Sequence, residues 1–120
     1  MDKSQAKLFA ECKKILLKAK EDRMNGLHAL KNELLREVQG DEGDMASALS
    51  EQHNALTQRD RFMNEIREID QALDRMETGQ YGICEETGEP IEVNRLRAIP
   101  WTRLSLEGAE MRERYKRRFA

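Results

Sequence analysis

The sequence predicts a mainly α-helical protein, a long antiparallel coiled-coil hairpin with a small globular end and a C-terminal helix. Charged residues make up 37% of the chain, well above the roughly 25% of an average globular domain. Apolar residues nevertheless recur at helical spacing in two long stretches, which favours a coiled coil over disorder. We therefore expect a hairpin over residues 1–78, with its tip at 40–46, and a separate subdomain over residues 79–120.

The first helix is expected from about Lys3 to Gln39, a stretch that has no proline and a single glycine, Gly26. Its apolar seam advances in steps near three and four residues. The seam consists of Phe9, Cys12, Leu16, Ala19, Leu27, Leu30 and Leu34. Residues 40–44, with two glycines and three acids, predict a turn, in which Gly40 is placed to end the first helix.

The second helix is expected from about Met45 to Thr78, with Asp44 as its N-cap. Its apolar seam follows, towards its end, the alternating steps of a heptad. The seam consists of Leu49, Leu56, Phe62, Ile66, Ile69, Leu73 and Met76. Two helices of this length, joined by so short a turn, must pack antiparallel.

Residues 81–100 differ in character from the hairpin. The Thr87-Gly-Glu-Pro90 turn signal lies between short apolar patches, which predicts a small β-hairpin followed by an irregular segment. A final helix is expected over about residues 104–119. Its end is basic, through Arg112, Arg114, Lys116, Arg117 and Arg118.

The composition narrows the function classes. A net charge of −2 gives the chain no bulk attraction to nucleic acid or to a membrane. The first residues lack a signal peptide's apolar core and no apolar run approaches membrane-spanning length, so we expect a cytoplasmic protein. Cys12 and Cys84 do not indicate a disulfide framework, and His28 and His53 lack the pairing of a metalloenzyme helix. An enzyme is therefore not expected.

Residues 84–108, the segment from Asp41 to Ala46 and the run Arg59-Asp60-Arg61 carry a resemblance to the DksA/TraR family. In that family's zinc finger, two C-x2-C pairs are separated by seventeen residues. Mapped without gaps, the four ligand positions are Cys84, Thr87, Ser105 and Gly108. The family's tip signature D-x-x-D-x-A falls on Asp41, Asp44 and Ala46, and its arginine-aspartate-arginine pattern is matched by Arg59, Asp60 and Arg61. Together the matches cover about residues 5–118.

The resemblance implies a regulator that enters the secondary channel of bacterial RNA polymerase and alters the stability of promoter complexes. Asp41, Asp44 and Ala46 would then be the effector residues at the tip, and Arg59 and Arg61 would contact polymerase from the flank. Such a factor is not an enzyme, is expected to be a monomer and does not bind DNA sequence-specifically.

The sequence departs from the family in two respects. Tetrahedral zinc needs four thiolate, imidazole or carboxylate ligands, and of the four positions only Cys84 supplies one, so no zinc is expected. The subdomain must instead close by packing, with candidates Tyr81, Ile91, Leu96, Ile99, Trp101 and Leu104. Basic positions that bind ppGpp in responsive members map to Glu68, Ile99 and Ala109, which does not favour ppGpp binding at that site.

Two other functions stay open at this point. A Gre-like transcript-cleavage factor also inserts an acidic hairpin tip into this channel, but it follows the hairpin with a larger β-rich domain. A coiled-coil adaptor with an acidic turn and no link to polymerase is the other alternative.

Overall fold

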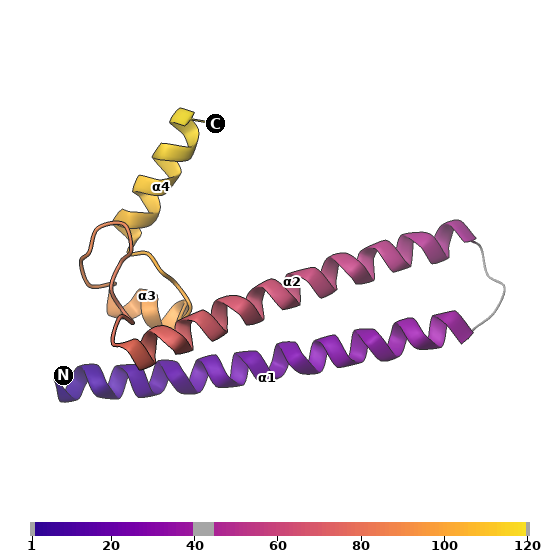
Figure 1. Ribbon diagram of the computed structural model, residues 1–120, viewed down its shortest axis with the longest axis horizontal. Coiled ribbons are helices and arrows are strands. Elements are labelled where there is room, and N and C mark those ends of the chain that lie inside the picture. Colours follow the sequence, from indigo (N-terminus) through magenta and orange to yellow (C-terminus); the bar gives the residue numbers. More distant parts are fainter. Residues whose placement is uncertain (1, 40–44, 120) are drawn as a thin grey trace. The chain divides into compact units, whose positions relative to one another are not determined.

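The computed structural model describes residues 2–39 and 45–119, which form four helices (Figure 1). Helix α1 spans Lys3–Gln39, α2 Met45–Thr78, α3 Val93–Ala98 and α4 Leu106–Phe119. The mainly α-helical class and the bounds of both long helices are confirmed, whereas α4 begins at Leu106 instead of residue 104. The predicted tip turn, including Gly40 and Asp44, lies outside the described residues.

The chain divides into two compact units. Residues Lys18–Glu68 form one, here called the hairpin unit. Met1–Leu17 and Ile69–Ala120 form the other, here called the finger unit. None of the helices within residues 2–39 and 45–119 combines the length and apolar character that a membrane span requires.

In the hairpin unit, α1 and α2 run antiparallel, as predicted. Arg23 of α1 donates from Nε to Glu65 Oε2 of α2 at 2.9 Å. Gly26 faces Phe62 so closely that an added Cβ would lie 2.9 Å from the ring. Gly26 follows Arg23 in α1 whereas Phe62 precedes Glu65 in α2, as an antiparallel pair requires. Among the described side chains of this unit none is fully buried, so the contact between the two helices leaves much apolar surface accessible.

The finger unit holds the core. Its buried apolar side chains are Leu8, Cys12, Leu16, Ile69, Ala72, Tyr81, Cys84, Ile91 and Leu96. Phe9 meets the Tyr81 ring edge-on with centroids 4.9 Å apart, and the Tyr81 hydroxyl donates to Pro100 O at 2.7 Å. Of the predicted packing residues, Tyr81, Ile91 and Leu96 are buried, and the other three are half-buried.

The β-hairpin predicted within residues 81–100 is wrong. An isolated antiparallel bridge joins Ile83 and Pro90, and no strand forms in this described segment. Hydrogen bonds from Cys84 N to Glu89 O and from Ile91 N to Gly82 O flank the bridge, at 2.8 Å each. Pro90 has no N–H to extend this ladder, and the chain turns into α3, which buries Leu96.

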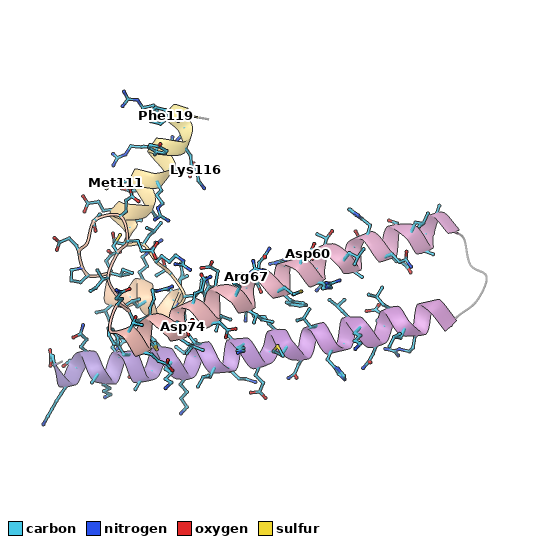
Figure 2. All side chains as sticks on the ribbon, in the orientation of Figure 1. Asp60, Arg67, Asp74, Met111, Lys116 and Phe119 are labelled. Carbon is cyan, nitrogen blue, oxygen red and sulfur yellow. The ribbon has the colours of Figure 1, made fainter. Side chains whose placement is uncertain are left out.

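Helix α4 carries exposed side chains along much of its length, and Figure 2 labels Met111, Lys116 and Phe119 among them. Tyr115 and Phe119 lie one turn apart, with ring centroids separated by 4.7 Å. The basic end predicted from the sequence therefore lies on a helix whose apolar side chains are also accessible.

Gly82 has a left-handed φ of +84°, and a Cβ there would lie 3.0 Å from Phe9 Cζ. Gly79 has a similar φ of +79° but open space around it. We expect Gly79→Ala to cost about 1–2 kcal/mol of unfolding free energy through backbone strain alone. Gly82→Ala should cost about 1–3 kcal/mol more, because the methyl group crowds a packed ring. Urea denaturation of both variants measures the difference, and equal losses would contradict the role assigned to Phe9.

Candidate functional site

The four positions that map to the family's zinc ligands lie together in the finger unit. Cys84 and Thr87 come from the loop after α2, Ser105 precedes α4, and Gly108 lies in its first turn. Ser105 acts as the N-cap of α4, because its Oγ accepts from Gly108 N at 3.0 Å and its carbonyl accepts from Ala109 N at 2.9 Å. A helix cap therefore occupies the place of the third metal ligand.

The Cys84 thiol is 1% exposed and faces hydroxyl and amide groups. Burial raises its pKa, but hydrogen bonds from the Ser105 and Thr87 hydroxyls and from their backbone amides outweigh burial and lower the pKa to about 6. The lowered pKa favours the thiolate form of Cys84 at neutral pH. Charge-assisted hydrogen bonds then tie the loop at Thr87 to the start of α4.

These residues do not fit a four-cysteine zinc site. They supply one thiolate, two hydroxyls and no side chain at Gly108. A Cβ built on Gly108 would overlap Cys84 Sγ and would lie 3.3 Å from Ser105 Oγ, so the space of a fourth ligand is closed. Within the part of the chain that the structure describes, no three His, Cys, Asp or Glu side chains gather as metal ligands do.

An ion-pair network borders this cluster, and sequence reasoning missed it. Glu85 accepts from Arg103 at 2.9 Å and from Arg112 at 3.4 Å, and Arg112 also donates to Glu86 at 2.9 Å. Burial opposes ionisation of Glu85, but Arg103 and Arg112 outweigh it and hold the pKa of Glu85 below its usual range. The bond to Glu86 is the main cause that raises the pKa of Arg112. The network joins the Cys84 loop to α4.

The predicted contact residues Arg59 and Arg61 are both exposed on α2. Asp60 between them is also exposed and is labelled in Figure 2. Arg61, whose side chain is 78% exposed, reaches Glu65 Oε1 at 3.4 Å and lines a polar groove with Asp22 and Arg23. Arg59 lines a different groove, because residues two positions apart on a helix point in nearly opposite directions. The structure therefore does not bring the two arginines together.

The groove beside Arg59 is apolar and has a volume of about 410 Å³. Its other lining residues are Leu27, Leu30, Lys31, Leu34, Leu35 and Met63. We call it the leucine groove. Sequence reasoning assigned three of these leucines to the helix seam and did not anticipate a groove beside it.

Of the predicted tip residues, Ala46 is exposed in the first turn of α2, while Asp41 and Asp44 lie outside the described residues. Glu68, Ile99 and Ala109, the positions of the family's ppGpp contacts, are each half-buried. The roles assigned to the tip residues and to the ppGpp positions therefore stay predictions.

Comparison with known proteins identifies the family. The family model of the prokaryotic DksA/TraR C4-type zinc finger matches residues 79–114. "RNA polymerase-binding transcription factor DksA" of Caulobacter vibrioides is 42% identical over 104 residues, covering 76% of this chain and 73% of that protein. An uncharacterized protein of Aquifex aeolicus is 57% identical over 49 residues, covering 41% of this chain and 34% of that protein.

A solved structure has the same fold. Transcription factor DksA2 from Pseudomonas aeruginosa superposes with a TM-score of 0.85 at 32% identity. The match covers 98% of this chain and 89% of that one. Sequence similarity over most of both chains and a shared fold show that this chain belongs to the DksA/TraR family.

Proposed function

We propose that this protein binds bacterial RNA polymerase in its secondary channel and regulates transcription initiation without catalysing a reaction. The observation that carries the proposal is the 42% identity, across 76% of the chain, to a relative named for binding RNA polymerase. The fold shared with a transcription factor over 98% of the chain supports it. We further propose that the protein is a cytoplasmic monomer and that it does not bind DNA sequence-specifically.

In this proposal the tip and the flank of the hairpin have separate tasks. Asp41, Asp44 and Ala46 act on the catalytic region of polymerase, while Arg59 and Arg61 supply affinity. The exposure of Ala46, Arg59 and Arg61 is consistent with these tasks. Arginine suits the flank, because its planar guanidinium forms paired hydrogen bonds with carboxylates at an interface.

The Gre-like alternative is less well supported. A Gre factor follows its hairpin with a larger β-rich domain, whereas described residues 79–119 contain two helices and an isolated bridge. An RNA-cleavage assay on backtracked polymerase complexes separates the two functions, since transcript cleavage would favour a Gre-like factor.

The direct test measures binding to core polymerase and inhibition of a ribosomal promoter in vitro. Absence of binding would overturn the proposal and favour a coiled-coil adaptor.

We further propose that ppGpp adds little at the shared site, because Glu68, Ile99 and Ala109 offer no cation to a polyphosphate. Strong synergy with ppGpp, on polymerase that lacks its factor-independent ppGpp site, would contradict that part.

We also propose that the finger unit is stable without zinc, held by the Cys84 hydrogen bonds and the Arg112 ion pairs. A structural zinc contributes on the order of 10–16 kcal/mol to small fingers, so a zinc-dependent fold would collapse in a chelator. We expect the melting temperature to be the same with and without a strong chelator. Elemental analysis that finds about one zinc per folded chain would contradict the proposal.

A further inference from the structure

The leucine groove is open although it lies beside the helix seam. Leu35 is 52% exposed and Met63 is 42% exposed, and both line the groove. Leu35 follows the seam residue Leu34 and has no place in the spacing that pairs α1 with α2. Contiguous exposed apolar surface of this kind marks an interaction site on soluble proteins. The packing of α1 against α2 does not account for the exposure of Leu35 and Met63.

Among the described side chains that line the groove, the two charged ones are cations, Lys31 and Arg59. The described lining of a second groove in the hairpin unit includes Glu33 and Glu51 but no cation. The two grooves therefore have opposite electrostatic character, in a chain whose net charge is −2. Charge complementarity selects an acidic partner for the leucine groove.

The backbone groups at the groove also restrict the secondary structure of the partner segment. The groove is formed by side chains of two helices, whose interior N–H and C=O groups are already bonded within each helix. An extended peptide would find no backbone partners there, and its own polar groups would be desolvated without compensation. A helix satisfies its own backbone and can place apolar side chains at i, i+3 or i+4 into the groove.

We infer that the leucine groove docks an acidic amphipathic helix of RNA polymerase. Its apolar face packs on Leu35 and Met63, and its carboxylates pair with Lys31 and Arg59. This inference rests on the proposed function and specifies the surface that supplies affinity.

The test compares Met63→Glu with Met24→Glu in binding to core polymerase. Met24 belongs to the same unit, is 50% exposed and does not line the groove, so it is a matched control. We expect Met63→Glu to weaken affinity about tenfold or more, because it places a carboxylate where an apolar anchor binds. Met24→Glu should stay within about twofold of the wild type. Circular dichroism checks that both variants keep the wild-type helix content.

A second pair of variants tests the charge and does not alter the apolar lining. Arg59→Glu should weaken binding about as much as Met63→Glu, whereas Arg59→Lys should lose much less. The wild-type affinity should fall as salt rises, and Arg59→Glu should show a shallower salt dependence. Because the proposed function already assigns affinity to Arg59, Lys31→Glu is the independent test of the groove. It should weaken binding about as much as Met63→Glu, and it decides the inference should Met63→Glu unfold the hairpin.

The outcomes separate the inference from the proposed function. If the wild type does not bind polymerase, both fail. If the wild type binds and Met63→Glu and Lys31→Glu bind equally well, the groove inference is overturned and the proposed binding to polymerase stands. An equal loss in Met24→Glu also overturns it. A dimer of this chain that Met63→Glu abolishes would assign the groove to a second copy and overturn it as well.

Discussion

An Asp44→Asn variant is expected to lose its effect on promoter complexes by about tenfold or more, while its affinity for core polymerase changes less than about threefold. Asparagine caps helices as well as aspartate does, so the predicted start of α2 is preserved and mainly the charge is removed. Because the flank supplies affinity in the proposed function, loss of a tip carboxylate should reduce regulation and not binding. In vitro transcription and a binding titration on the same samples measure the two quantities.

The neighbouring residue Glu42 offers a matched control for this prediction. Glu42→Gln removes the same charge from the same predicted turn but lies outside the D-x-x-D-x-A pattern. We expect it to regulate as the wild type does, and Asp41→Asn to behave like Asp44→Asn. An equal defect in Glu42→Gln would show that the total charge of the turn matters. Equal losses of binding and regulation in Asp44→Asn would make the tip a docking contact.

The long helices could be predicted because their signals are local and repeated many times. Each has a proline-free stretch with a periodic apolar seam, bounded by glycines at 40 and 79. The later start of α4 was also readable in principle. Ser105 stands three residues before Gly108, the spacing at which a serine hydroxyl caps a helix, and the structure contains that bond.

The segment between α2 and α4 could not be predicted from its local pattern. A turn signal between short apolar patches fits a β-hairpin as well as a loop with one bridge. Distant contacts decide the outcome: Leu96 is buried in the core, Cys12 Sγ lies 3.7 Å from Leu96 O, and Arg95 Nε donates to Leu104 O at 2.8 Å. These contacts hold α3 in place.

The candidate site could be predicted from the sequence only in part. Motif spacing predicted that Cys84, Thr87, Ser105 and Gly108 would correspond to ligand positions, and the structure brings them together. The motif spacing did not predict that Arg103 and Arg112 both pair with Glu85, because the two arginines lie in different segments of the chain. The leucine groove was hidden for a related reason, since periodicity identifies a seam but not how completely it is covered.

The stability of the protein is expected to rise with pH between about 6 and 9 through the Cys84 thiolate. Its folded pKa of about 6 lies below the ordinary thiol value of 9.0, so the unfolded chain holds more protons within this window. The thiolate therefore stabilises the fold fully above about pH 9, and its contribution is lost as the pH falls through about 6. At 1.36 kcal/mol per pKa unit, the full contribution amounts to about 4 kcal/mol at most.

Urea denaturation at a series of pH values measures this slope in the wild type and in Cys84→Ser. Serine stays neutral in this range and keeps hydrogen-bonding capacity, so Cys84→Ser should lose most of the rise in stability between pH 6 and 9. Cys12→Ser is the matched control, because it removes the other buried cysteine and leaves the Cys84 cluster intact; its slope should match the wild type. Glu85, whose pKa is lowered, contributes only at more acidic pH, because its ionic contribution is complete above about pH 5. A Cys84→Ser protein with the wild-type slope would show that neutral hydrogen bonds hold the finger unit together and that the thiolate adds nothing.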